Sequence, residues 1–174
     1  MKILIIGQAR TGKTTAANYL SKLLKCHTFS LADPLKKMVF QLLRLFDIPI
    51  DSIEDLYSDD KKEKYRHYMQ QVGTECCREM FGKDVWCNVL NDKLQDSWII
   101  ADVRFQNEFE YFCEKYPDVI TIGITRTIGG FASGSHTSEN DTQYFKHKIQ
   151  HHINNNGTIE ELHDELRKII NMHR

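Results

Sequence analysis

The stretch GQARTGKT, from Gly7 to Thr14, decides the fold of this 174-residue chain. It matches the pattern GxxxxGK[ST], in which a glycine-rich loop surrounds the phosphates of a nucleoside triphosphate. The loop follows MKILIIG, whose apolar run predicts a buried strand, and precedes an amphipathic stretch from Lys13 to Lys25 that predicts a helix. Because strand, loop and helix in this order are the context that the pattern requires, the sequence predicts a P-loop.

Each kind of residue in this loop has a physical reason to be there. Glycines let the backbone turn tightly, so that successive N–H groups point inward toward a bound anion. The N-terminus of the following helix adds positive potential. Lys13 is expected to reach the β- and γ-phosphates, and the Thr14 hydroxyl is expected to ligate Mg²⁺. The residues expected to bind the nucleotide here are Gly7, Ala9, Thr11, Gly12, Lys13, Thr14 and Thr15.

The composition is that of an ordinary globular domain. The formal net charge is -1, whereas proteins that bind nucleic acid or a membrane surface generally carry a large basic excess. No apolar run reaches membrane-spanning length, and we expect no signal peptide, so we expect a cytoplasmic protein with no nucleic-acid or membrane partner. The five cysteines include no CxxC pair, which favours reduced thiols over disulfides or a zinc site.

Strand patterns alternate with helix patterns along the rest of the chain. This alternation predicts an α/β fold of the three-layer P-loop NTPase type with about five parallel strands. The strands expected after the first are His27 to Ser30, Ser97 to Val103, Val119 to Thr125 and His151 to Asn154. We expect one domain, 1–174, with a core at about 1–32 and 96–174, a helical insertion at about 33–95 and a Gly/Ser-rich lid at about 126–139.

The insertion and the remaining segments have helical spacing. Asp33 with Pro34 predicts a helix start, because Asp caps helices and Pro suits their first position. Residues 51–65 are charge-rich and predict a short helix followed by a mobile connection. Further helices are expected at Arg66 to Met80, Asp84 to Leu94, Phe105 to Tyr116, Glu139 to Lys148, and after Thr158, where Glu161 completes a capping box.

Phosphoryl transfer depends on positive charge and positioning, so the charged residues near strand ends are candidates for the chemistry. Asp102 ends a predicted strand and is expected to hold Mg²⁺ or a water bound to it, with a helix cap as the alternative. Arg126 ends the next strand and opens the lid, with an ordinary loop charge as the alternative. Arg66 and Gln70 share a helix face, but solvated surface charge is the usual state of arginine. Trp86 either stacks on a base or packs in a core.

The chain resembles the deoxynucleoside monophosphate kinases of bacteriophages and large DNA viruses. The resemblance covers most of the chain, and the P-loop is its least specific part. Its other motifs are LADPLK at 31–36, RHYMQQVGTECCREMFGKDVW at 66–86, ADVRFQNE at 101–108, TR at 125–126, HTSE at 136–139 and NNNGTIEEL at 154–162.

This resemblance implies a binding site for an acceptor nucleotide on the insertion. It implies that Arg66, Gln70, Gly73, Thr74 and Trp86 hold the acceptor, with Asp33 and Lys36 lining its pocket. It further implies that Asp102, Arg104 and Glu108 lie between donor and acceptor, that Arg126 acts from the lid, and that Asn155 to Gly157 lie near the donor adenine. The catalytic set so defined is Lys13, Arg66, Asp102, Arg104 and Arg126, with Thr14 and Asp102 as metal ligands.

We therefore expect an enzyme that transfers the γ-phosphate of ATP, with Mg²⁺, directly to a deoxynucleoside 5′-monophosphate. A viral origin would place it in the host cytoplasm. The sequence does not choose between a monomer and a homodimer. One alternative is another P-loop small-molecule kinase, such as an animal-type phosphomevalonate kinase, which shares the basic P-loop, the PLK segment and the DxR strand end. Another is a non-catalytic nucleotide-binding module, although the NKxD motif of GTPase switches is absent.

Overall fold

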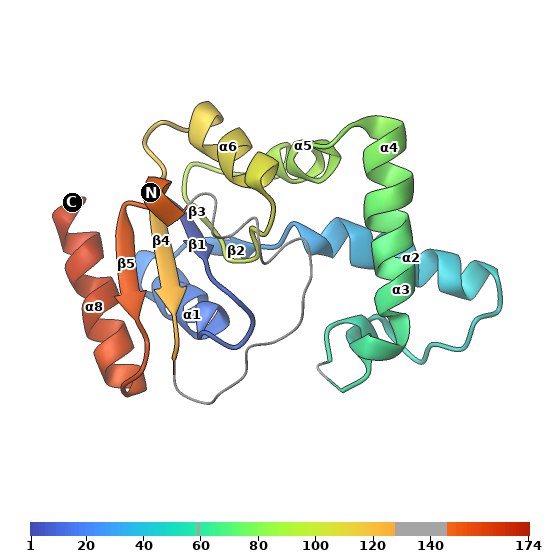
Figure 1. The fold of residues 1–174 in the computed structure, drawn as a ribbon, viewed down its shortest axis with the longest axis horizontal. Coiled ribbons are helices and arrows are strands. Elements are labelled where there is room, and N and C mark those ends of the chain that lie inside the picture. Colours follow the sequence, from blue (N-terminus) through green and yellow to red (C-terminus); the bar gives the residue numbers. More distant parts are fainter. Residues whose placement is uncertain (59, 128–145) are drawn as a thin grey trace. The chain divides into compact units, whose positions relative to one another are not determined.

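The computed structural model describes residues 1–58, 60–127 and 146–174 (Figure 1). Within them the chain forms two compact units. Unit 1 comprises Met1–Ser30 and Leu94–Arg174, and unit 2 comprises Leu31–Lys93. The bounds of unit 2 almost coincide with the insertion that the sequence predicts at about 33–95.

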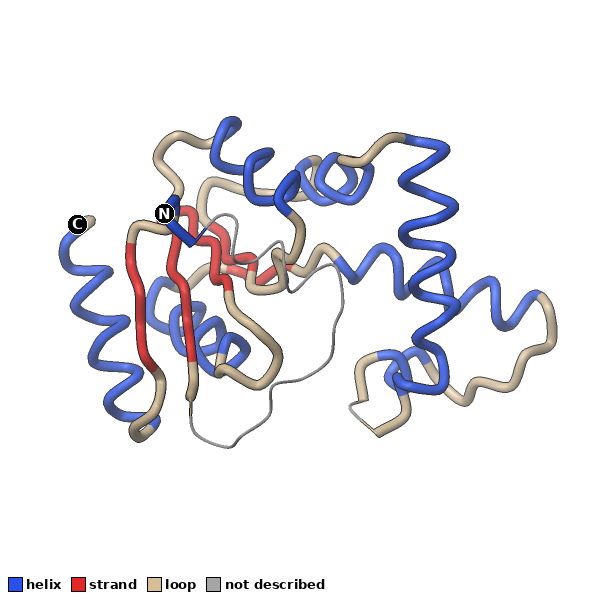
Figure 2. The backbone as a smooth tube through the Cα atoms, in the orientation of Figure 1, coloured by secondary structure: helices blue, strands red, loops and turns tan. Residues whose placement is uncertain are grey.

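Unit 1 is built on a five-stranded parallel sheet with the strand order β2-β3-β1-β4-β5 (Figure 2). The strands are β1 (Lys2–Ile6), β2 (His27–Phe29), β3 (Trp98–Ile100), β4 (Ile120–Thr125) and β5 (His151–Asn154). Central β1 pairs with β3 through Ile3 opposite Ile99, and with β4 through Ile3 opposite Ile120. The prediction of a parallel five-stranded α/β fold is confirmed, with β3 shorter than the apolar run from Ser97 to Val103 suggested.

Helices cover both faces of this sheet. Ile3 and Ile5 of β1 point to one face and enter a core with α1 (Lys13–Leu24) and α8 (Ile159–Met172). The alternate residues Leu4 and Ile6 point to the other face, where α6 (Gln106–Lys115) packs. On that side the ring centroids of Trp98 and Phe112 lie 5.8 Å apart. Apolar residues on both sides explain why β1 has an uninterrupted hydrophobic sequence.

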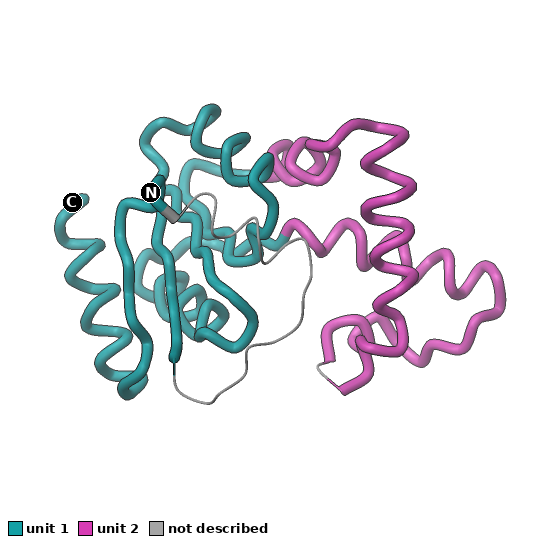
Figure 3. The backbone as a smooth tube through the Cα atoms, viewed as in Figure 1, with its two compact units in different colours: residues 1–30, 94–174 teal, residues 31–93 magenta. Residues whose placement is uncertain are grey.

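Among its described residues, unit 2 consists of helices and connecting turns, without a strand (Figure 3). Its buried centre is formed by Val39 and Leu43 of α2, together with Leu56 and Tyr65. Residues 51–65, predicted as a short helix and a mobile connection, form two short 3₁₀ turns in their described part. The elements are α2 (Ala32–Leu45), η1 (Ile53–Leu56), η2 (Lys62–Tyr65), α3 (Arg66–Gln70), η3 (Gln71–Cys76), α4 (Cys77–Phe81) and α5 (Val85–Asn91).

The predicted helix from Arg66 to Met80 forms, but its middle is a π-helix. Elements α3, η3 and α4 follow one another without a break, and η3 has the sequence QVGTEC. Gly73 lies in this π-helix, and a Cβ there would approach Leu35 Cδ2 to 2.6 Å. The Gly73 carbonyl accepts a hydrogen bond of 3.0 Å from Trp86 Nε1. The wide turn is therefore packed closely against α2 and held by a buried indole.

Helix ends differ from prediction in two places. Asp33 is not the N-cap of α2, because the helix begins at Ala32 and Asp33 lies in its first turn. The helix expected from Glu139 to Lys148 falls largely outside the described residues, and Lys146–Lys148 forms a 3₁₀ turn, η4. The capping box of α8 is confirmed, because Thr158 Oγ1 accepts from the Glu161 amide at 3.2 Å.

None of the helices described by the structure combines the length and the apolar character needed to cross a membrane.

Replacing Trp86 by Phe should lower the free energy of unfolding by about 1–2 kcal/mol more than replacing Trp98 by Phe. Both residues are buried and lose the same volume, but Trp98 Nε1 has no hydrogen-bond partner among the described residues, whereas Trp86 Nε1 bonds to Gly73. Urea denaturation followed by far-ultraviolet circular dichroism measures the difference. Equal losses in the two variants would show that the bond to Gly73 contributes nothing to stability.

Candidate functional site

The predicted P-loop joins β1 to α1, and its backbone excludes side chains at both glycines. A Cβ on Gly7 would collide with the carbonyl oxygen of Ile124 in the neighbouring strand β4. Gly12 has φ 102° and faces the side-chain nitrogen of Asn155, so a Cβ there would be both strained and obstructed. The motif glycines are thus required by close backbone packing even before a nucleotide is considered.

Side-chain bonds fix the loop from within. Thr11 is buried, and its hydroxyl donates to the Gln8 carbonyl at 3.0 Å. Lys13 Nζ donates to the same carbonyl at 2.5 Å. Ala9, Thr14 and Thr15 are exposed. Because Thr14 and Thr15 lie in the first turn of α1, their exposed position suits the binding of an anion at a helix N-terminus.

Lys13 has an unusual electrostatic environment. Burial, and then the neighbouring Arg104 guanidinium, lower its pKa to about 8, while Asp102 opposes both effects. Because burial makes the charged form of Lys13 unfavourable in the free protein, bound polyanionic phosphates stabilise that form strongly. Lys13 and Arg104 together form a positive centre that requires an anion.

Asp102 lies just after β3, at the same sheet edge as the P-loop. The Ser30 hydroxyl, just after β2, donates to Asp102 Oδ2 at 2.6 Å. The alternative role of Asp102 as a helix cap is wrong, because Phe105 is the N-cap of α6. A carboxylate and a hydroxyl are ligands that suit Mg²⁺, and the influence of Asp102 on the pKa of Lys13 places it close to the loop that presents Thr14. The residues present therefore fit a Mg²⁺ ion held by Thr14 and Asp102.

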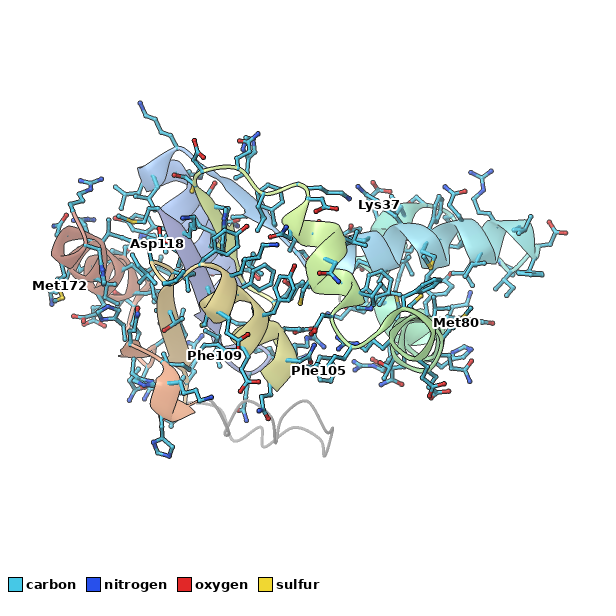
Figure 4. The ribbon with its side chains drawn as sticks, turned by 90° about the horizontal axis from the view of Figure 1, so that it is seen from above. Lys37, Met80, Phe105, Phe109, Asp118 and Met172 are labelled. Atoms are coloured by element: carbon cyan, nitrogen blue, oxygen red, sulfur yellow. The ribbon has the colours of Figure 1, made fainter. Side chains whose placement is uncertain are left out.

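Glu108 supports the backbone that presents Arg104. Its side chain is buried, and Oε2 accepts from the backbone amides of Arg104 at 2.8 Å and Phe105 at 3.1 Å. Figure 4 labels Phe105 at the start of α6 and Phe109 further along it, on the side of the strands away from α1. The structure gives Glu108 a structural partner rather than an open position toward an acceptor, while Arg104 itself is exposed.

Arg126 is exposed directly after β4, and the lid that the sequence predicts at about 126–139 lies outside the described residues beyond Thr127. Asn156, which belongs to the segment expected near the donor adenine, pairs through its side chain with Thr127 next to Arg126. Asn155, also expected near the donor adenine, donates its side-chain amide to the Thr11 carbonyl at 2.8 Å.

In unit 2, three residues expected to hold an acceptor share an exposed side of one helical run. Arg66, Gln70 and Thr74 are all exposed, at successive turns of α3 and η3. Arg66 makes two contacts with Glu63 Oε2, through Nη2 at 2.7 Å and Nε at 2.8 Å. Gly73 is buried on the opposite side of the run. Side chains on the exposed side can thus meet a ligand, whereas Gly73 serves packing.

Asp33 and Lys36 are brought together by Tyr57, which sequence reasoning missed. The Tyr57 hydroxyl donates to Asp33 Oδ1 at 2.9 Å, and Lys36 Nζ lies 3.7 Å from the centroid of the Tyr57 ring. Burial, and then the bond to Asp33, raise the pKa of Tyr57 to about 12. The residue was missed because 51–65 was interpreted as a mobile connection. Tyr57 keeps its proton at physiological pH and organises two candidate acceptor ligands.

Trp86 is 5% exposed and donates its indole N–H to Gly73. Of the two interpretations of this residue, the structure agrees with packing in a core.

A P-loop on a parallel sheet of this strand order, with a basic residue pair and an acid beside it, defines a P-loop small-molecule kinase, which is a phosphotransferase. The chain belongs to the phosphomevalonate kinase family, whose family model matches residues 5–118. It is also 30% identical to a protein of Acanthamoeba polyphaga mimivirus named "Putative deoxynucleotide monophosphate kinase", over 93% of this chain and 92% of the viral protein. The resemblance to deoxynucleotide kinases of large DNA viruses is thereby confirmed.

Solved structures agree on the fold. Shikimate kinase from Aquifex aeolicus aligns with a TM-score of 0.53 at 16% identity, covering 99% of this chain and 97% of that enzyme. A gluconokinase from Sinorhizobium meliloti aligns with a TM-score of 0.51 at 10% identity, covering 99% and 95%.

The affinity for ATP should fall by about tenfold between pH 7 and pH 9, because Lys13 loses its proton around pH 8 in the free protein and must be charged when phosphate is bound. The measurement is isothermal titration calorimetry with ATP and Mg²⁺ and without an acceptor. Lys13→Arg is the control, since its guanidinium does not titrate in this range and its affinity should be independent of pH. A wild-type affinity that is equally flat would contradict the lowered pKa of Lys13.

Proposed function

We propose that this protein phosphorylates deoxynucleoside 5′-monophosphates to diphosphates, with ATP as the donor and Mg²⁺ bound at the site. The observation that supports this acceptor most strongly is the similarity to the mimivirus protein along nearly the whole chain. The segment from Arg66 to Trp86 adds to it, because its QxxGTE motif is the part of the resemblance that concerns the acceptor. Unit 1 binds the donor, and residues of unit 2 bind the acceptor.

The proposed reaction needs no covalent enzyme intermediate. A phosphate oxygen of the acceptor attacks the γ-phosphorus in line, its bond to phosphorus forms as the bond to the leaving ADP oxygen breaks, and ADP departs. Lys13, Arg104 and Arg126 stabilise the charge on the transferred phosphoryl group. Thr14 and Asp102 would hold Mg²⁺, which would supply additional positive charge to the phosphates. The hydroxyl of Ser30 orients the Asp102 carboxylate.

The acceptor is held in this proposal by the exposed side of the α3–η3 run and by the Tyr57 cluster. Arg66 is the candidate for the acceptor phosphate, because its planar guanidinium already holds a carboxylate oxygen of Glu63 through two nitrogens. Asp33 and Lys36, joined by Tyr57, offer an acceptor and a donor of hydrogen bonds for the sugar and base. Trp86 contributes by holding the Gly73 backbone.

Phosphomevalonate is the second candidate acceptor, and the match of the family model over residues 5–118 favours it. The two acceptors present the same nucleophile, a phosphate oxygen, so the donor chemistry is identical for both. They differ in the rest of the molecule: a base and a sugar require flat and polar contacts, whereas mevalonate is a small acid with a second negative charge.

A coupled assay that offers the common deoxynucleoside and nucleoside monophosphates and phosphomevalonate, each with ATP and Mg²⁺, distinguishes the candidates. We expect turnover with at least one deoxynucleoside monophosphate and none with phosphomevalonate. Lys13→Ala should lower turnover by about 10²–10³-fold with the fold preserved, because one stabilising charge on the transferred group is lost. Turnover only with phosphomevalonate would replace the proposed acceptor, and ATP binding without any transfer would favour a non-catalytic module.

Arg66→Ala should weaken the binding of the monophosphate acceptor by about tenfold or more while ATP affinity changes by less than about twofold. Isothermal titration calorimetry of each ligand provides the measurement. Glu63→Gln is the matched control, because it removes the competing carboxylate and leaves Arg66 in place, so acceptor affinity should be maintained or increased. Equal weakening of both ligands by Arg66→Ala would remove Arg66 from the acceptor site.

A further inference from the structure

Two consecutive asparagines after β5 connect parts of the donor site that are far apart in sequence. Asn155 reaches the P-loop near the start of the chain, and Asn156 reaches the residues that follow β4. The two contacts are made by side chains of adjacent residues, so neither end can move without affecting the short segment between β5 and α8.

Asn155 supports the P-loop backbone at its tightest turn. Its side chain is buried, and Nδ2 donates to the Thr11 carbonyl at 2.8 Å. The same nitrogen occupies the space where Gly12 would carry a Cβ. Thr11 and Gly12 immediately precede Lys13, and in the trans peptide that joins them the Thr11 carbonyl and the Gly12 N–H point in opposite directions. A donor behind the loop therefore stabilises the orientation that binds an anion.

Asn156 fixes the backbone next to Arg126. Its Oδ1 accepts from the Thr127 amide at 2.8 Å, and its Nδ2 donates to Thr127 Oγ1 at 2.5 Å. On the other side of Arg126, the backbone N–H of Asn155 donates to the Thr125 carbonyl at 2.7 Å. Arg126 is thus the single residue between two anchored neighbours, and its side chain is exposed.

The asparagines are followed directly by the start of α8, which has its own capping bonds. Thr158 N donates to Glu161 Oε2 at 2.9 Å, and Thr158 Oγ1 accepts from the Glu161 amide at 3.2 Å. Gly157 lies directly against this capping box, because a Cβ there would collide with the Glu161 carboxylate. The asparagines therefore lie between β5 and a helix start whose conformation is fixed by reciprocal bonds.

We propose that Asn155 and Asn156 are positioning residues of the kinase, Asn155 for the P-loop and Asn156 for Arg126. The inference rests on the proposed nucleotide site, in which the P-loop holds the β-phosphate and Arg126 contacts the γ-phosphate. Asn155 then governs affinity for any nucleotide with a β-phosphate, and Asn156 governs the extra affinity that comes from the γ-phosphate. A general structural role would affect both nucleotides alike.

The first test compares Asn155→Asp with Asn154→Asp in the full chain. The Asp at 155 replaces a donor by an acceptor that faces the Thr11 carbonyl, whereas Asn154 is an exposed neighbour and receives the same charge. Calorimetry should show about tenfold weaker binding of both ADP and AMPPNP for Asn155→Asp, and changes within about twofold for Asn154→Asp. If Asn155→Asp does not fold, Asn155→Ala is measured in its place. Wild-type affinity for ADP in a folded variant would overturn the role of Asn155.

The second test compares Asn156→Leu, Asn156→Asp and Arg126→Ala. Asn156→Leu loses both bonds to Thr127, whereas Asp can keep them if the Thr127 hydroxyl donates. We expect Asn156→Leu to bind ADP within about twofold of wild type and AMPPNP about tenfold more weakly, with Asn156→Asp close to wild type. The double variant Arg126→Ala/Asn156→Leu should bind AMPPNP no more weakly than Arg126→Ala alone, because residues that act as a unit are not additive.

Equal losses for ADP and AMPPNP in Asn156→Leu, additive losses in the double variant, or no effect of Arg126→Ala on AMPPNP would each overturn the role of Asn156. Both tests use nucleotide binding without an acceptor. An incorrect acceptor assignment would therefore appear in the turnover panel and leave these affinities unchanged.

Discussion

The burial of β1 on both faces, with a hydrogen-bonded neighbour on each side, is the constraint on which unit 1 depends. A strand in this position cannot move or slip, because every shift by one residue would exchange two sets of apolar side chains between opposite cores. Its carboxyl end therefore delivers Gly7 to a fixed point. Since all strands are parallel, β3, β4 and β5 deliver Asp102, Arg126 and Asn155 to the same edge.

This edge collects charge that the protein alone does not neutralise well. Lys13 lies near Arg104, and its lowered pKa records both its burial and that like-charge neighbour. Asp102 offsets part of the repulsion but is also engaged by Ser30. Two cations and one carboxylate around a loop of backbone N–H groups leave a positive surplus. Triphosphate oxygens complement this positive surplus. The folded protein already bears the desolvation cost of burying Lys13 before a nucleotide binds.

Sequence patterns predicted those parts of the structure that depend on local chemistry. The P-loop glycines, the apolar strands and the Thr158–Glu161 capping box each follow from neighbouring residues, and each is found where expected. The π-helical turn was not predictable from helical spacing, because it depends on Leu35 and Trp86, which are distant in sequence from Gly73. Tyr57 was hidden in a charge-rich segment whose order comes from tertiary contacts with Asp33 and Lys36. Long-range partners of this kind leave no periodic pattern.

The same contrast between local and long-range signals separates the proposed donor site from the proposed acceptor site. The donor unit uses backbone geometry that any P-loop kinase must share, so its residues were predictable from one short motif. The acceptor candidates use exposed side chains, Arg66, Gln70 and Thr74, whose identity is free to change with the acceptor because they do not support the core. Phosphate on the acceptor is common to a nucleotide and to phosphomevalonate, and Arg66 suits either. Discrimination must therefore lie beyond the phosphate, and the cluster of Asp33, Tyr57 and Lys36 has the mixed polar and aromatic character that the proposed sugar and base would require.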